Sequence, residues 1–118
     1  MRKLINPKYS HLSRQFDRLL NTDYFELHGE LLYDVGRNMI KRFQWEGVDL
    51  VIKRFGHITF FNRLMYSTIR ESKAMRAYKN ASKLRAMGIS TPEEIAVIEI
   101  FSHGILTESY FVSAYTSN

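Results

Sequence analysis

The residue of this chain best placed to bind an anionic group is Lys53, which follows the apolar run Leu50-Val51-Ile52. The β-branched residues of this run predict a buried strand within Val48–Phe55. An ammonium group beside buried residues costs free energy unless it meets a partner or a ligand. Lys53 is therefore a candidate ligand-binding residue, and the alternative is an edge-strand lysine whose side chain extends into water.

Other patterns that would indicate catalysis are absent from the sequence. The chain has no cysteine, which excludes disulfides and thiolate metal sites, and it has neither a Gly-x-Ser-x-Gly motif nor a Ser/His/Asp arrangement. The four histidines show no paired metal-ligand spacing, so we expect no metal site. They are His11, His28, His57 and His103.

Composition predicts one globular domain, residues 1–118, with 45% hydrophobic residues. No apolar run is long enough to span a membrane, and the N-terminus has no signal-peptide pattern. We expect a cytoplasmic protein. The net charge of +5 favours anionic partners, which include nucleotides, nucleic acid and anionic lipid headgroups.

The predicted strand around Lys53 is the third of a meander. Apolar patterns predict strands at 30–33, 39–45 and 48–55, joined by turns at 34–38 and at Glu46-Gly47. Residues 1–9 are expected to be irregular. A short helix that begins at Ser10 would follow them and end at Asn21-Thr22-Asp23, with these residues on its apolar face: Leu12, Phe16, Leu19 and Leu20.

After Lys53 the apolar period changes to that of a helix. Residues 61–68 show helical spacing, and a longer helix is predicted from Ser72, its N-cap, to Gly88, its C′ residue. Its apolar face would carry Ala74, Ala77, Tyr78, Ala81 and Leu84. Strands at 95–101 and 105–115 complete the order β-β-β-α-β-β. We therefore predict an α+β fold with a five-stranded antiparallel sheet packed on one main helix.

This order, with a lysine on the third strand, resembles the small lobe of a protein kinase, and more specifically the lipopolysaccharide kinase family, whose members phosphorylate Kdo or heptose sugars. The resemblance covers nearly the whole chain and is strongest to the Bacteroidetes-type members. The motifs that carry it are Ile5 to Tyr9, Gly36-Arg37-Asn38, Val51–Phe55, Ser72-Lys73-Ala74, Arg76-Ala77-Tyr78, Asn80-Ala81, Gly88-Ile89, Thr91-Pro92-Glu93, Ile98-Glu99 and Ser109–Ser113.

The resemblance implies an ATP-binding lobe. Lys53 would contact the nucleotide phosphates, and Val51, on the same face of the strand, would pack on the adenine. The turn at 34–38, with Gly36, Arg37 and Asn38, would cover the phosphates through its backbone N–H groups. A hinge of Ser113, Ala114 and Tyr115 would bind the adenine edge.

Two positions depart from the kinase pattern. Only Gly36 remains of the glycine-rich loop, and it is equally suited to a hairpin turn that requires positive φ. No acidic residue lies between Ser72 and Met87, so the partner expected for Lys53 would be Glu71, one turn before Met75. The alternative for Glu71 is a solvated charge at a helix N-terminus.

Kinase chemistry also needs a catalytic-loop aspartate and Mg²⁺-binding aspartate in a large lobe. The aspartates of this chain all precede Lys53: Asp17, Asp23, Asp34 and Asp49. We therefore expect no catalytic residue and no metal ligand in this chain. It would bind ATP, with Mg²⁺ ligands in the absent lobe, and would meet a lipopolysaccharide precursor only if that lobe is present. We expect no phosphoryl transfer by the chain alone.

Two other functions stay open. The chain could be a non-catalytic module that forms a homodimer through the apolar floor of the lobe, or a small basic nucleic-acid-binding domain, although no nucleic-acid motif supports the latter. The long helix carries basic residues that form either a solvated face or a surface for anionic lipid at the inner membrane. They are Lys73, Arg76, Lys79, Lys83 and Arg85.

Overall fold

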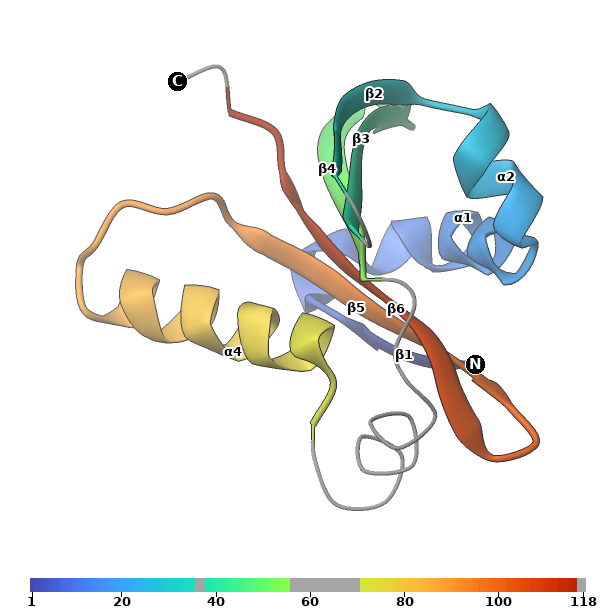
Figure 1. Ribbon diagram of the computed structural model, residues 1–118. Helices are drawn as coiled ribbons and strands as arrows, with labels where there is room; N and C mark the ends of the chain where they lie inside the picture. The colour runs from blue at the N-terminus through green and yellow to red at the C-terminus, as the bar shows by residue number, and fades with distance from the viewer. Residues whose placement is uncertain (36–37, 56–70, 117–118) are drawn as a thin grey trace.

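The computed structural model describes residues 1–35, 38–55 and 71–116 (Figure 1). Six strands in this part of the chain form one sheet in the order β1-β5-β6-β4-β3-β2, with every neighbouring pair antiparallel. The elements in chain order are β1 (Arg2–Ile5), the 3-10 helix η1 (Pro7–Leu12), α1 (Ser13–Phe16), the 3-10 helix η2 (Asp17–Leu20), α2 (Thr22–Leu27), β2 (Glu30–Val35), β3 (Asn38–Trp45), β4 (Val48–Phe55), α4 (Lys73–Ala86), β5 (Glu94–Ser102) and β6 (Ile105–Ala114).

The strand that carries Lys53 has the predicted bounds. β4 runs from Val48 to Phe55 and lies inside the sheet, between β3 and β6. Leu50 and Ile52 are fully buried, whereas Val51 and Lys53 on the opposite face are half-buried. A central strand with two covered faces explains why its sequence is an almost continuous apolar run.

The prediction of five strands is wrong, because the sheet has six. Residues 1–9, expected to be irregular, contain β1, which pairs with β5 from Arg2 opposite Glu99 to Ile5 opposite Ala96. Charged residues make up half of this strand, which hid it in the apolar pattern. An edge strand tolerates such charges, and β1 is held by its partner, since Arg2 Nε donates to Glu99 Oε1 over 2.6 Å.

The leading helix is longer and more broken than expected. η1, α1, η2 and α2 follow one another, and Leu12, Phe16 and Leu19 are fully buried as predicted. Leu20, expected on the same face, is 55% exposed. Asn21, expected at a helix end, begins α2 instead, because its side chain accepts a hydrogen bond from the backbone N–H of Asp23 over 3.0 Å.

The main helix, α4, has the predicted caps. The Ser72 hydroxyl accepts from the Met75 N–H over 3.1 Å, and Gly88 has a φ of +81° just after the helix. α4 packs on β5 and β6 through small residues, of which Ala74 and Ala81 are buried. Leu84, expected on this face, is 37% exposed. The helical spacing at 61–68 lies outside the described residues.

Different elements cover the two faces of the sheet. The N-terminal helices supply Phe16 and Phe25 to a core with residues of β3 to β6, including Trp45 and Tyr110. α4 lies on the other face, across β5 and β6 (Figure 1). Among the described residues no helix combines the length and apolar character needed to cross a lipid bilayer.

Candidate functional site

The half-buried face of β4 carries the predicted site residues. Val51, Lys53 and Phe55 alternate onto this face, and the Lys53 ammonium lies 4.7 Å from the centre of the Phe55 ring. In the sheet register Lys53 lies opposite Phe111 of β6 and Ile40 of β3. The lysine is therefore set in a partly apolar surface beside the strands that α4 covers.

Lys53 has no carboxylate partner within 4 Å among residues 1–35, 38–55 and 71–116, and Glu71 does not supply one. Glu71 forms an ion pair with Lys79 of α4 instead. Glu99 of β5 is a buried carboxylate that is 1% exposed. It lies opposite Ser109 of β6, which in turn lies opposite Phe55 of β4. It pairs with Arg2, so it is also committed elsewhere.

The predicted phosphate turn is only partly described. Gly36 and Arg37 lie outside the described residues. Asn38 is the first residue of β3, where it pairs with Phe55 on one side and Val35 on the other. Asn38 is thus a strand residue rather than a turn residue, and it lies at the end of β4 that carries Phe55.

The predicted hinge is the end of β6. Ser113 lies opposite Val51, so the residue expected to pack on adenine neighbours the segment expected to bind its edge. Two of its backbone groups already have partners: the Ala114 N–H donates to the Glu93 carbonyl over 2.9 Å, and the Tyr115 N–H donates to the Asp49 carbonyl over 3.0 Å. Binding of a purine here would use other groups of the segment.

The side chains around Tyr115 fix the end of this segment. The Arg42 guanidinium lies 3.8 Å from the centre of the Tyr115 ring and donates to both carboxylate oxygens of Asp49, over 2.8 and 2.5 Å. The hydrogen bonds from Arg42 hold the pKa of Asp49 below its usual value. A planar guanidinium that makes two hydrogen bonds to one carboxylate holds that carboxylate in one orientation. Arg42 and Asp49 therefore fix the position of the Tyr115 ring at the end of β6.

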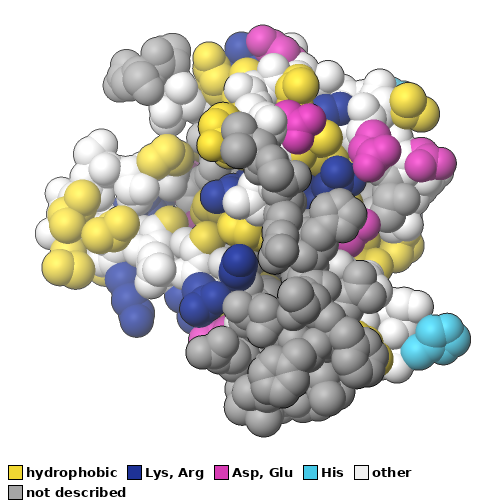
Figure 2. Space-filling model, in the orientation of Figure 1, with side chains coloured by type: hydrophobic (Ala, Val, Ile, Leu, Met, Phe, Trp, Pro, Cys, Tyr) yellow, Lys and Arg dark blue, Asp and Glu magenta, His cyan; other side chains and the backbone are white. Residues whose placement is uncertain are grey.

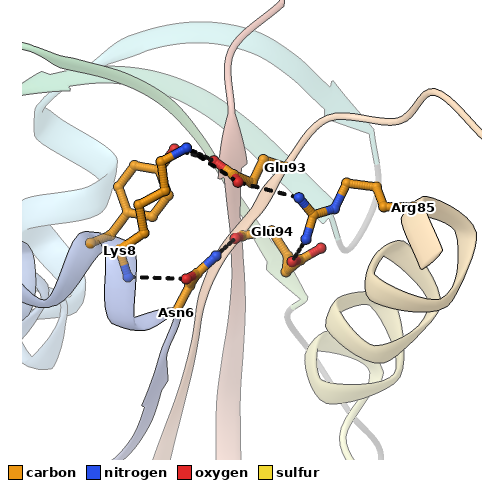
Figure 3. A network of polar contacts seen from close by, with 6 residues as sticks. Asn6, Lys8, Arg85, Glu93 and Glu94 are labelled. Atoms are coloured by element: carbon orange, nitrogen blue, oxygen red, sulfur yellow. Dashed lines mark hydrogen bonds and ion pairs between the residues drawn. The ribbon is translucent and has the colours of Figure 1, made fainter. Parts of the chain in front are cut away.

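A polar network joins the start of β5 to the end of α4 and to the N-terminal segment (Figure 3). Arg85, in the last turn of α4, contacts both Glu93 and Glu94, and Glu93 also accepts from the Tyr9 hydroxyl. Burial, followed by the bond to Glu93, raises the pKa of Tyr9 to about 12. The hydrogen bond from Tyr9 lowers the pKa of Glu93.

The network was missed by the sequence reasoning, although a signal was present. An arginine in the last helical turn and two glutamates directly after Thr91-Pro92 are of opposite charge and close in sequence. The Glu94 side chain is 3% exposed, and the described part of the chain offers its Oε2 no hydrogen-bond donor. Because the Glu93 carbonyl accepts from Ala114, the network positions the predicted hinge.

The most buried lysine of the described residues is on the other face of the sheet. Lys41 of β3 is 5% exposed, and its ammonium donates to the carbonyls of Glu26 and His28 over 2.7 and 2.8 Å. Burial lowers the pKa of Lys41, and Arg54 adds to this effect. No group of three or more His, Asp or Glu side chains in the described ranges is arranged to hold a metal ion.

The described residues therefore form an α+β fold, an antiparallel sheet with α4 on the face to which Lys53 points. The chain is similar to a solved structure of WaaP in complex with acyl carrier protein, with a TM-score of 0.55 and 18% sequence identity. The similarity covers 100% of this chain and 42% of the WaaP chain, so the chain spans less than half of that protein. No family model and no curated protein matches the sequence.

Proposed function

We propose that these residues form the nucleotide-binding small lobe of a kinase-like phosphotransferase that acts on a sugar of the lipopolysaccharide core. The observation that carries the proposal is Lys53: it is half-buried, lacks a carboxylate partner among the described residues, and shares a face with Val51, which neighbours Ser113. A cation in a partly apolar surface favours an anionic ligand. The similarity of fold to WaaP, a lipopolysaccharide core kinase, supports the same assignment.

In this proposal each residue has a separate role. Lys53 binds the α- and β-phosphates of ATP, Val51 packs on the base, and Ser113 to Tyr115 contact the base edge through groups other than the two bonded N–H groups. Gly36 and Arg37 contribute to the phosphate turn, and Asn38 adjoins it as the first residue of β3. Arg42 and the network around Glu93 keep the hinge in place.

These residues alone are not expected to catalyse phosphoryl transfer. Asp17 pairs with Lys3 and Asp49 with Arg42, so these two carboxylates are committed to structure. The described residues include no group of three or more His, Asp or Glu side chains that would fit a Mg²⁺ ion. The general base and Mg²⁺ ligands would belong to a second lobe, for which the larger WaaP chain offers a precedent in length.

The proposal is tested by titrating the purified chain with ATP in a calorimeter. Lys53→Ala should weaken binding about tenfold to a hundredfold, the range expected for a hydrogen bond to a charged group. Lys83→Ala, which removes an exposed lysine of α4, is the control and should leave the affinity unchanged. Equal affinities of the wild type and Lys53→Ala would remove Lys53 from the site.

A second candidate function is a non-catalytic module that dimerises. Ile40, Val51 and Phe111 on the face of Lys53 are only half-buried, which leaves apolar surface for a second copy. Sedimentation velocity distinguishes the two functions. A dimer that persists with and without ATP, and that Phe111→Glu dissociates, would favour this module over the nucleotide-binding lobe.

The proposed location is the cytoplasmic surface of the inner membrane, through the free end of α4. Hydrophobic side chains gather at this end beside Lys and Arg (Figure 2), and Met87 is 72% and Ile89 47% exposed. Exposed apolar groups flanked by cations suit an anionic lipid surface. Co-sedimentation with phosphatidylglycerol vesicles should fall in the double variant Lys79→Glu, Lys83→Glu, and unchanged binding would exclude this surface.

A further inference from the structure

A cavity that is separate from the lysine of β4 lies along the outer edge of β3. Its volume is about 520 Å³. Its lining includes four consecutive residues of β3, from Arg42 to Trp45, whose side chains alternate between the two faces of the sheet. A cavity that contacts both sets of side chains lies along the edge of the strand. The lining residues are Arg18, Tyr24, His28, Gly29, Glu30, Arg42, Phe43, Gln44 and Trp45.

The edge is open there because β3 is longer than its neighbour. The last pair of the β2–β3 ladder joins Glu30 to Arg42, and the chain before Glu30 turns away through Gly29 into α2. Phe43 to Trp45 continue beyond β2, paired only with β4 on their inner side. This open edge, residues 43–45, is about 10 Å long at the rise of a β-strand.

The backbone of Gln44 faces this open edge. In an antiparallel sheet the N–H and C=O of one residue point to the same side of the strand, and successive residues alternate. The Asp49 carbonyl accepts from Tyr115 on the β6 side of β4. Gln44 lies opposite Asp49, so its backbone N–H and C=O point the other way, toward the cavity, and among the described residues no strand lies beyond them.

Aromatic rings form the floor and one wall beside this edge. Phe43 and Trp45 are 5% and 6% exposed, with their ring centres 5.2 Å apart, and form the floor. Tyr24 and His28, stacked with their ring centres 4.3 Å apart, form the wall on the α2 side. Such rings bury apolar parts of a ligand, whereas the strand edge binds its backbone.

The cavity lining has two arginines and one carboxylate, that of Glu30. Arg42 accounts for the carboxylates on its side: it makes two hydrogen bonds to Asp49, and its guanidinium lies 3.9 Å from the Glu30 carboxylate. Arg18 contacts only Tyr24, by a bond of 3.2 Å to its hydroxyl and by stacking on its ring, and has no acidic partner among the described residues. An acidic group would therefore be bound here in preference to a basic one.

We propose that the open edge of β3 binds a short extended peptide that carries an acidic group. The peptide adds to the sheet beside Gln44, with which it exchanges two main-chain hydrogen bonds. One of its side chains packs on the floor of Phe43 and Trp45, and its carboxylate pairs with Arg18. This site is separate from the proposed nucleotide site, and its test does not depend on nucleotide binding.

The test begins with random heptapeptides displayed on phage and selected on the immobilised 118-residue chain. Selected peptides are synthesised and titrated, with the fluorescence of Trp45, the single tryptophan of the chain, as the readout. We expect enrichment of peptides with a β-branched or aromatic residue and an acidic residue, and a change in Trp45 emission. Absence of enrichment over an empty surface would overturn the proposal.

Backbone recognition is tested by a pair of variants at Gln44. Gln44→Pro removes the outward N–H, and proline is tolerated where that group faces solvent at an edge; peptide affinity should fall about tenfold, as for one lost hydrogen bond. Gln44→Thr retains the N–H and should bind like the wild type. Equal binding by the two variants, with unchanged circular dichroism, would contradict strand addition.

Charge recognition is tested independently of any backbone change. Arg18→Gln should weaken acidic peptides about tenfold and abolish the preference for them, whereas Arg14→Gln, an exposed arginine of α1, should have no effect. Retention of the acidic preference in Arg18→Gln would overturn the assignment of Arg18. A chain that dimerises through this edge, and loses the dimer in Gln44→Pro, would identify a second copy as the occupant instead.

Discussion

Lys41 and Lys53 lie on neighbouring strands and point to opposite faces of the same sheet. The Lys41 ammonium is buried and bound by two carbonyls at the end of α2, so its hydrogen-bonding capacity is used within the fold. The Lys53 ammonium is half-buried and contacts the Phe55 ring, and the described residues give it no carboxylate. Both lysines follow apolar neighbours in sequence, so the sequence alone does not separate them.

The difference between the two lysines teaches how a structural cation is distinguished from a ligand-binding one. A cation that the fold needs is saturated by protein groups, as Lys41 is by the carbonyls of Glu26 and His28, where the helix dipole also favours it. A cation that serves a ligand keeps donors free for it. The comparison predicts that Lys41 governs stability and Lys53 governs binding, which mutation can separate.

The largest effect is expected at Gly29, which follows His28 and so places one of the carbonyls that bind Lys41. Gly29 has a φ of +80°, and a Cβ there would lie 2.7 Å from the Phe43 ring. Gly29→Ala should lower the free energy of unfolding by about 3 kcal/mol, from backbone strain and steric overlap together. Denaturant unfolding measures this value.

Gly88→Ala is the matched control, because Gly88 has a φ of +81° and open space around its Cβ position. The free energy of unfolding of Gly88→Ala should fall by about 1 kcal/mol, which is the cost of positive φ alone. Equal losses in the two variants would show that the Phe43 contact does not constrain the region around Lys41.

A smaller loss is expected for Lys41→Met, which retains the apolar stem of the side chain but leaves the Glu26 and His28 carbonyls without their donor. The free energy of unfolding should fall by about 2 kcal/mol, the cost of unsatisfied polar groups near the core. ATP affinity should remain that of the wild type. If stability were unaffected, Lys41 would not be the structural lysine of the pair.

The same substitution at Lys53 should have little effect on stability. Lys53→Met removes no ion pair among the described residues, so the free energy of unfolding should change by less than about 0.5 kcal/mol, while ATP binding should weaken about tenfold to a hundredfold. Unfolding and calorimetry on the same preparation check both halves. A loss of stability as large as that of Lys41→Met would erase the distinction between the two residues.

The smallest expected effect is a difference in pH dependence. Burial lowers the pKa of Lys41 in the folded state, so in alkaline solution the unfolded chain retains a proton that the folded chain has released. Stability therefore rises with pH in the window between the lowered pKa and the ordinary value of 10.5. The difference in unfolding free energy between wild type and Lys41→Met, measured from pH 8 upward, should increase; a decrease would reverse the assigned shift.

Much of the fold could be predicted because local signals agreed with tertiary structure. The bounds of β4 and the caps at Ser72 and Gly88 follow from apolar runs and from side chains that satisfy helix ends. β1 could not be predicted, because half of its residues are charged and Arg2 is paired with Glu99 of β5, almost a full chain length away. The breaks between the N-terminal helices likewise depend on how they pack on the sheet.

The sequence predicted the strand that carries Lys53, but it did not predict which side chains surround that lysine. The sheet register sets Val51 beside Ser113, and their roles in nucleotide binding stay predictions. The partner expected for Lys53 was Glu71, whose pairing with Lys79 depends on side-chain geometry that sequence spacing does not define. Lys41 was missed because a lysine in a strand is usually exposed, whereas β3 places Lys41 on its buried face together with Phe43.

The pairing of β1 with β5 has a consequence for how the chain acquires its structure. Arg2 and Glu99 are 97 positions apart, so β1 leaves the ribosome well before the strand with which it pairs. Contacts of such long sequence separation slow folding, because the chain between them must be closed into a loop first. During synthesis the edge of the sheet therefore stays unfinished until β5 has emerged, and the buried Glu99 carboxylate gains its counter-charge only then.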